Sequence, residues 1–118
     1  MRSLGETYTE KTLNELNISY KKEYIFKDLI GDSKSLRFDF AIFKNDTLYC
    51  LIECQGHEHQ MPISFWGGEE KFKKRIKYDK LKKDYCLLHK IPLYYIPYQD
   101  YNKIDKQYLY NLLNKMEG

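Results

Sequence analysis

The sequence predicts an α/β domain built on a mixed four-stranded sheet with helices on both sides. Three strand-like apolar segments follow one another in the first half of the chain, which indicates a meander. A long charged segment with helical spacing then leads to a fourth apolar strand, as a crossover connection would. The expected order is α-β-β-β-α-β-α, and 118 residues suit one domain over 1–118 with a single core.

The first half of the chain is expected to form one helix and three strands. A helix is predicted over Ser3–Leu16, with Ser3-x-x-Glu6 and Thr7-x-x-Glu10 as two candidate capping boxes. Strands are predicted at Tyr24–Ile30, Leu36–Phe43 and Leu48–Gln55. Asn45 and Asp46 are turn residues, so the last two strands are expected to pair as a hairpin. Alternation predicts one shared apolar face on the middle strand, formed by Leu36, Phe38, Phe40 and Ile42.

The second half is expected to supply the crossover helix, the fourth strand and a closing helix. The predicted segments are a loop at Gly56–Gly68, a helix at Glu69–Lys90, a strand at Pro92–Tyr98 and a helix at Asp105–Met116. The predicted apolar stripe of the long helix is Phe72, Ile76, Leu81, Tyr85 and Leu88. The closing helix is expected to turn inward Tyr108, Leu109, Leu112, Leu113 and Met116.

Charge and cysteine content narrow the class of protein. The formal net charge is only +3, but Glu69–Asp84 carries eight bases and four acids. Such a basic helix can contact phosphates, and an ordinary solvated helix face has the same composition. Three cysteines without a CxxC pair are expected as buried thiols in a reducing cytosol. The polar start and the lack of a long apolar run predict a cytoplasmic protein without a membrane segment.

Two carboxylates interrupt the apolar strands of the predicted hairpin. Counting outward from the turn brings Asp39 close to Glu53. A carboxylate among apolar residues is unfavourable unless it is paired or binds a metal, and two carboxylates on adjacent strands suit Mg²⁺. The alternative is a salt bridge, for which Arg37 is a partner for Glu53 on the same face.

Other ionisable residues lie near these strands or on the helices. His57 and His59 follow the third strand closely, and their ordinary pKa suits proton transfer, although exposed loop histidines are common. A zinc site is less attractive because the nearby cysteines are expected on the opposite face. Asp79 and Lys82 have the spacing of a surface ion pair.

Six stretches in order, covering about Ser3–Tyr98, carry a resemblance to a known family. They are Ser3-Leu4-Gly5-Glu6, Leu36-Arg37-Phe38-Asp39-Phe40, Ile52-Glu53-Cys54-Gln55-Gly56-His57-Glu58-His59, Phe65-Trp66-Gly67-Gly68, Asp79-x-x-Lys82-x-x-Tyr85-Cys86 and Ile91-Pro92-Leu93-Tyr94-Tyr95-Ile96-Pro97-Tyr98. Together they resemble the PD-(D/E)XK nuclease superfamily, with its restriction-endonuclease-like core. They are most similar to the branch of the very-short-patch repair endonuclease and of phage homing endonucleases, whose active sites carry a Glu–Asp–X–His–Asp set.

The resemblance implies a metal site and a set of DNA contacts. Asp39 would be the main Mg²⁺ ligand, Glu53 would bind or support the metal, and the Cys54 carbonyl would be a further ligand. Glu6 would reach the site from the first helix. The bases of the second helix that would hold the DNA backbone are Lys74, Arg75, Lys82 and Lys83.

The resemblance also assigns the proton transfer. His59 takes the position of the family histidine and would deprotonate the attacking water, whereas His57 does not. Asp79 would orient His59 or a water. Gln55 stands where the superfamily usually has lysine and the phage branch often has aspartate. Glutamine can orient a water or a phosphate oxygen, but it carries no charge and cannot act as a base.

The function expected from the resemblance is Mg²⁺-dependent hydrolysis of DNA phosphodiester bonds, with Mn²⁺ able to substitute. Homing, repair nicking and junction cleavage are the roles it suggests. A single site either nicks one strand or requires a homodimer to cut both. Two alternatives remain: a nuclease-fold module that binds nucleic acid without cutting, because Gln55 replaces a charged residue, and a domain that binds only protein partners.

Overall fold

A computed structural model describes residues 3–56 and 68–115. The elements in chain order are α1 (Leu4–Glu15), β1 (Ser19–Gly31), β2 (Lys34–Lys44), β3 (Thr47–Gln55), α2 (Gly68–Leu88), β4 (Leu93–Pro97), η3 (Tyr98–Lys103) and α3 (Lys106–Asn114). The expected α/β class is confirmed, and so is the order of helices and strands. The 3₁₀ helix η3 is an addition that the sequence did not indicate.

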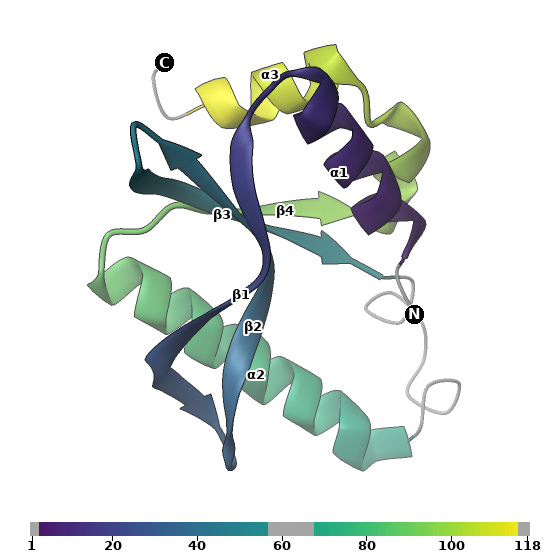
Figure 1. The fold of residues 1–118 in the computed structure, drawn as a ribbon. Helices are drawn as coiled ribbons and strands as arrows, with labels where there is room; N and C mark the ends of the chain where they lie inside the picture. The colour runs from purple at the N-terminus through teal and green to yellow at the C-terminus, as the bar shows by residue number, and fades with distance from the viewer. Residues whose placement is uncertain (1–2, 57–67, 116–118) are drawn as a thin grey trace.

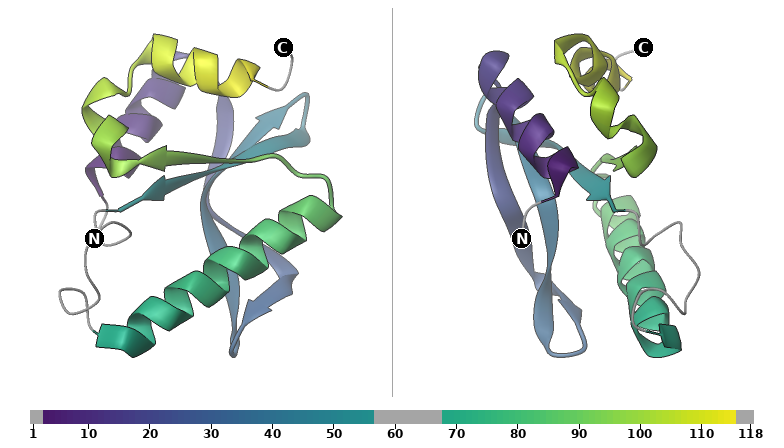
Figure 2. Two further views of the ribbon diagram at one scale, coloured as in Figure 1. Left: turned by 180° about the vertical axis from the view of Figure 1, so that it is seen from behind. Right: turned by 90° about the vertical axis from the view of Figure 1, so that its right-hand side faces the viewer.

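The four strands form one mixed sheet in the order β1-β2-β3-β4. The pairs β1–β2 and β2–β3 are antiparallel, and β4 joins β3 in parallel. A parallel neighbour requires a crossover, which α2 supplies. Figures 1 and 2 show α1 and α3 together on one side of the sheet and α2 on the other.

Local chemistry accounts for the ends of α1 and for the β2–β3 turn. Ser3 is the N-cap of α1, and its hydroxyl accepts a hydrogen bond from the backbone N–H of Glu6 at 3.1 Å. Of the two candidate capping boxes, Ser3-x-x-Glu6 is therefore correct. Asn45 and Asp46 have φ values of 53° and 63°, as a tight two-residue hairpin turn requires.

The first strand begins five residues before the predicted Tyr24. Its start at Ser19 pairs with Phe43 at the end of β2. This part of β1 has mostly exposed side chains, so it lacks the apolar alternation by which a strand is found in a sequence. The backbone pairing, rather than side-chain burial, defines it.

Strand β2 changes the face to which its apolar side chains point. Phe38 packs in the cluster against α2, whereas Phe40 packs in the cluster against α1 and α3. The prediction of one shared face is therefore wrong: Leu36 lies with Phe38, and Ile42 lies with Phe40. On the neighbouring strand β1, Glu23 has a φ of 51°, and the β1–β2 register has no Glu23–Asp39 pair at this point. Asp39 thus occupies the point at which the face changes.

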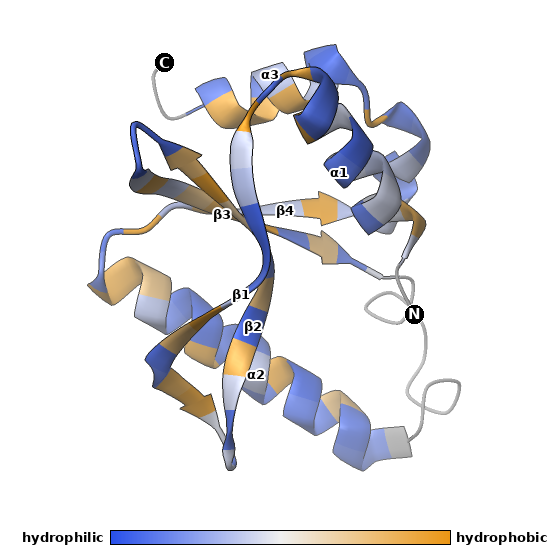
Figure 3. Ribbon diagram, in the orientation of Figure 1, coloured by the Kyte–Doolittle hydropathy of each residue, from blue (hydrophilic) through white to orange (hydrophobic). Residues whose placement is uncertain are grey.

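Two apolar clusters hold the layers together. The first joins Leu13 of α1 and Leu109 of α3 to the sheet, and the second joins Cys86 of α2 to its other face. Figure 3 shows hydrophobic residues concentrated on the strands and a mostly hydrophilic α2. Leu109, Leu112 and Leu113 of α3 are buried as expected, whereas Met116 lies outside the described residues.

The contact stripe of α2 differs from the predicted one. Ile76 and Leu88 are 53% and 77% exposed, so they do not belong to the stripe. The residues that pack on the sheet are Tyr78, Leu81, Tyr85 and Cys86. Because these include two tyrosines and a cysteine, a stripe counted from the most hydrophobic residues is misplaced. None of the helices in the described part of the chain has the length and apolar character that a membrane span needs.

Candidate active site

The side chain of Asp39, on β2, is held beside the neighbouring strand β3 by a hydrogen bond from the backbone of that strand. The β2–β3 register pairs Phe40 with Ile52, so the next position outward sets Asp39 across from Glu53, as the hairpin count predicted. The backbone N–H of Cys54 donates to Asp39 Oδ2 at 2.7 Å. Burial raises the pKa of Asp39 to about 6, against the lowering effect of this hydrogen bond.

Glu53 faces α2 and forms an ion pair with a lysine of this helix. Lys82 Nζ lies 2.8 Å from Glu53 Oε1, and each of these side chains is only 15% exposed. Burial first, and then the neighbouring Asp39, raise the pKa of Glu53 to about 7, and Lys82 opposes this. The two acids therefore form one electrostatically coupled pair, and Lys82 is the cation that contacts it within the described residues.

Two of the expected ion pairs are replaced by others. Arg37 contacts Glu23 at 3.3 Å on the surface and not Glu53. Lys82 bonds Glu53 rather than Asp79, whose negative charge also raises the pKa of Glu53. The alternative in which Arg37 neutralises Glu53 is thus wrong. The cause is the docking of α2 on this face, which brings a cation that strand spacing could not indicate.

Glu6 reaches the carboxylates through the close packing of α1 on η3. A side chain at Gly5 would meet the ring of Tyr101 at 2.4 Å, so glycine allows this contact. The hydroxyl of Tyr101 in turn donates to the carbonyl oxygen of Gln55 at 2.8 Å. The first turn of α1 is thereby fixed beside the end of β3. The charge of Glu6 there contributes to the raised pKa of Asp39.

A cavity of about 190 Å³ opens between the end of β3 and α2. Its lining includes six residues of the predicted site but neither Asp39 nor Glu6, and the residues are Glu53, Cys54, Gln55, Arg75, Tyr78, Asp79, Lys82 and Tyr95. The thiol of Cys54 is engaged with the hydroxyl of Thr9 on α1, at 3.7 Å. All three cysteines are free, as expected. The cavity therefore offers carboxylates, cationic donors and an amide, but no thiolate.

The remaining basic residues of α2 are distributed around this cavity. Lys74 lines a second, more open cavity of about 820 Å³ between α2 and the β1–β2 hairpin, together with Lys34 and Arg37. Tyr78 lines both cavities, so they adjoin. Lys83 Nζ lies 5.4 Å from the ring centroid of Tyr95. Three of the four predicted phosphate contacts are thus at or next to the carboxylates, and Lys74 lies further along the helix.

Asp39 and Glu53 could bind a divalent cation only in a site to which the protein contributes few ligands. Within residues 3–56 and 68–115, no group of three or more His, Cys, Asp or Glu side chains is arranged to hold a metal ion. Mg²⁺ is commonly held by one or two carboxylates, with waters and substrate phosphates completing its shell. The raised pKa values of both carboxyls indicate negative charge that Lys82 alone does not neutralise. The donor set therefore suits Mg²⁺, with Lys82 as a competitor for Glu53.

Some predicted site residues lie outside the described part of the chain, and one residue of the cavity was not predicted from the sequence. His57 and His59 fall within 57–67, so the predicted role of His59 stays a prediction. Tyr95 lines the cavity but was absent from the predicted site. It is the parallel partner of Glu53 in the β3–β4 register. The register of a parallel pair cannot be counted from a turn, so the sequence did not place Tyr95 beside Glu53.

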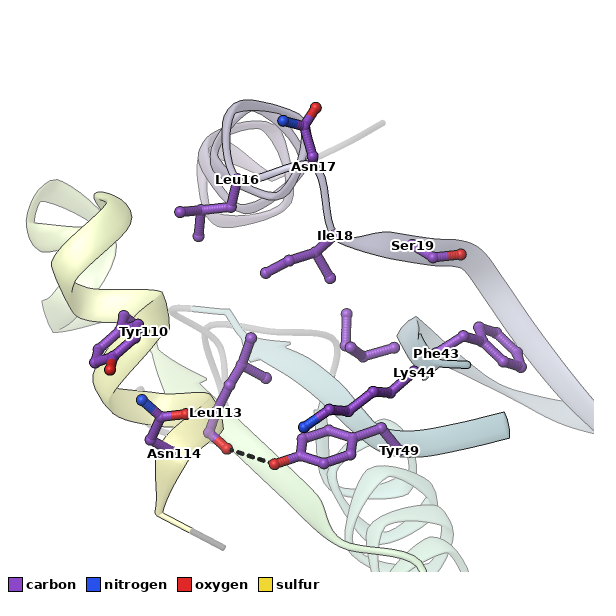
Figure 4. A pocket seen from close by; sticks show the side chains of 11 residues that line it. Leu16, Asn17, Ile18, Ser19, Phe43, Lys44, Tyr49, Tyr110, Leu113 and Asn114 are labelled. Carbon is purple, nitrogen blue, oxygen red and sulfur yellow. Dashed lines mark hydrogen bonds between the residues drawn. The ribbon is translucent and has the colours of Figure 1, made fainter. Parts of the chain in front are cut away.

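A separate apolar cavity of about 470 Å³ lies on the other side of the sheet, among α1, α3 and the β2–β3 hairpin. Figure 4 shows it, with the hydroxyl of Tyr49 donating to the carbonyl of Leu113 at 3.1 Å. Among the described residues that line it, only Lys44 is charged. It lacks paired carboxylates, so we place the chemistry in the smaller polar cavity.

The described site thus combines Glu6, Asp39, Glu53 and Asp79 from four different elements with Lys82 and Arg75 from α2. This arrangement can bind a cation through the carboxylates and an anion through the bases. Comparison of the chain with protein-family models, with curated proteins and with solved structures finds no match.

Proposed function

We propose that this chain is a Mg²⁺-dependent endonuclease that hydrolyses DNA phosphodiester bonds, of the restriction-endonuclease-like type that its sequence resembles. The observation that carries the proposal is the coupled pair Asp39 and Glu53, buried on adjacent strands beside Lys82. Buried carboxylates with raised pKa values are typical of functional sites. An ion pair that serves only stability needs one carboxylate and one cation, whereas here a second carboxyl lies beside the same cation.

The residues of the cavity have distinct tasks in this proposal. Asp39 and Glu53 would hold Mg²⁺, which when bound supplies Lewis-acid stabilisation of the phosphoryl group. Lys82 and Arg75 donate to the phosphate oxygens, and their positions i and i+7 are on one face of α2. His59 accepts the proton of the attacking water, and Asp79 orients this histidine. Gln55 lines the same cavity and orients a water or a phosphate oxygen.

The path of the DNA backbone follows from the two adjoining cavities. Lys34, Arg37 and Lys74 line the open cavity next to the carboxylates. Their positive charges suit the phosphates that flank the cleaved bond, and contacts of this kind carry little sequence information. The β1–β2 turn is tied to α2 because Lys77 bonds Asp32 at 2.8 Å. Hairpin and helix therefore present these bases as one surface.

A second candidate function is nucleic-acid binding without cleavage. The contact that favours it is the ion pair between Lys82 and Glu53, which already supplies one carboxylate with a cation. Gln55 adds to this because it is uncharged where related nucleases carry a charge. In that case the cavity would bind phosphates through its bases, and Mg²⁺ would have little effect on affinity.

The test is nicking of supercoiled plasmid by the purified protein with Mg²⁺ or Mn²⁺, and with EDTA. We expect metal-dependent nicking that Asp39→Asn and His59→Ala abolish. Asp46→Asn is the matched control, because this aspartate lies in the hairpin turn with a φ that asparagine tolerates. Retardation of DNA without product would favour the second function. Equal nicking by wild type and both site variants would refute the first.

A further inference from the structure

The hydroxyl of Tyr95 is a buried hydrogen-bond donor with no partner among the described residues. Other tyrosine hydroxyls of the fold are engaged: Tyr85 donates to Asp28 at 2.7 Å, and Tyr108 donates to Asp100 at 2.8 Å. A buried donor without an acceptor destabilises a protein, and such groups are rare in folded proteins. An unused donor of this kind points to an acceptor that the described residues 3–56 and 68–115 do not provide.

Tyr95 lies where a ligand of the cavity would be within reach. It is paired with Glu53 in the parallel β3–β4 register, and it lines the 190 Å³ cavity with Arg75 and Lys82. Burial raises the pKa of Tyr95, and the charges of Asp79 and Glu53 raise it further. A phenol hydroxyl can donate one hydrogen bond to an external oxygen. Lys83 Nζ lies over the ring, 5.4 Å from its centroid.

We propose that Tyr95 Oη binds an oxyanion in this cavity, a phosphoryl oxygen of the substrate, together with Arg75 and Lys82. The inference rests on the proposed phosphodiesterase function and adds a binding residue to it. The three donors come from two elements that face each other across the cavity, β4 and α2. Two of these donors are cations and the third is a neutral hydroxyl, a set that suits an oxyanion, while Glu53 and Asp79 line the same cavity with negative charge.

The test compares Tyr95→Phe with Tyr94→Phe. Each change removes only a hydroxyl, but Tyr94 packs in the cluster on the other side of the sheet. Binding of inorganic phosphate is followed by NMR titration of backbone amides, plasmid nicking is measured in parallel, and urea unfolding reports stability. We expect Tyr95→Phe to weaken phosphate binding about tenfold, to slow nicking, and to unfold at equal or higher urea concentration than wild type. We expect Tyr94→Phe to retain phosphate affinity and nicking rate.

The outcomes separate this inference from the nuclease proposal. Phosphate binding that depends on Tyr95, in a protein that does not nick DNA, would support the inference and refute the nuclease function. Nicking and phosphate affinity that are unchanged in Tyr95→Phe would refute the inference and leave the nuclease function intact. A wild-type protein that binds no phosphate would also refute it. So would a Tyr95→Phe variant that is less stable but binds phosphate normally, since the hydroxyl would then serve a structural water.

Discussion

Replacing Asp39 with asparagine should make the metal-free protein more stable at alkaline pH. Burial raises the pKa of Asp39 to about 6 and that of Glu53 to about 7, from ordinary values of 3.8 and 4.5. Between about pH 4 and pH 7 the folded protein therefore binds more protons than the unfolded chain. The contribution of this pair to stability is most favourable below about pH 4, and it is lost progressively as the pH rises to 7.

The size of the effect follows from the two shifts. One pKa unit corresponds to about 1.4 kcal/mol, so shifts of about two units set an upper limit of about 3 kcal/mol for each carboxyl. Solvent screening of these incompletely buried groups reduces this limit. Asparagine removes the charge but keeps an oxygen for the Cys54 N–H. We expect Asp39→Asn to raise the free energy of unfolding by about 2 kcal/mol at pH 8 and by less than about 0.5 kcal/mol at pH 4.

Urea unfolding in EDTA at pH 4 and pH 8 measures this difference. Asp46→Asn is again the control, and it should have the same small effect at both pH values. An Asp39→Asn protein that is no more stable than wild type at pH 8 would refute the reasoning, because the carboxylate would then not be an uncompensated charge. A gain in stability together with lost nicking would identify Asp39 as a residue kept for function at a cost in stability.

Two further predictions concern the basic residues of α2. Lys82→Met leaves Glu53 without its cation and should lower the free energy of unfolding by about 3 kcal/mol at pH 8. The loss should be much smaller at pH 5, where Glu53 is protonated. Urea unfolding at the two pH values tests this, and an equal loss at both would contradict it. Lys74→Gln should reduce the slope of log affinity for duplex DNA against log salt by about 1, in anisotropy titrations over several salt concentrations. Lys44→Gln, on the other side of the sheet, should leave that slope unchanged, and equal slopes for all three proteins would argue against a DNA path along α2.

The parts of the site that were predictable are those set by local structure. Asp39 and Glu53 could be brought together because a two-residue turn fixes the register of a hairpin. The N-cap at Ser3 is likewise a local signal. The face change of β2 was not predicted, because the alternation of the sequence assumes a regular strand, and at the same level on β1 Glu23 has a positive φ and no Glu23–Asp39 pair forms. Glutamate carries no special signal for a positive φ.

The parts that were missed depend on contacts between distant segments. The ion pair of Lys82 with Glu53 requires the docking of α2, and the position of Tyr95 requires the register of a parallel pair. Leu81 and Tyr85 of the predicted α2 stripe are confirmed, but Tyr78 and Cys86 take the places that were expected for more hydrophobic residues such as Ile76 and Leu88. Sequence periodicity reports that a helix is amphipathic, but not which partner residue it meets.

The parallel pairing of β3 with β4 has a consequence for when the cavity comes into existence. Strands β1 to β3 are joined by short turns, so their pairing closes only short loops of chain. The wall formed by Asp79, Lys82 and Tyr95 belongs to the crossover helix α2 and to β4, which follows it in the chain. A growing chain that has emerged only as far as Gln55 already carries Asp39 and Glu53, but it lacks this wall. The pair is enclosed only when the second half of the chain has been synthesised and has docked, so the order of synthesis delays the assembly of the site until the domain is nearly whole.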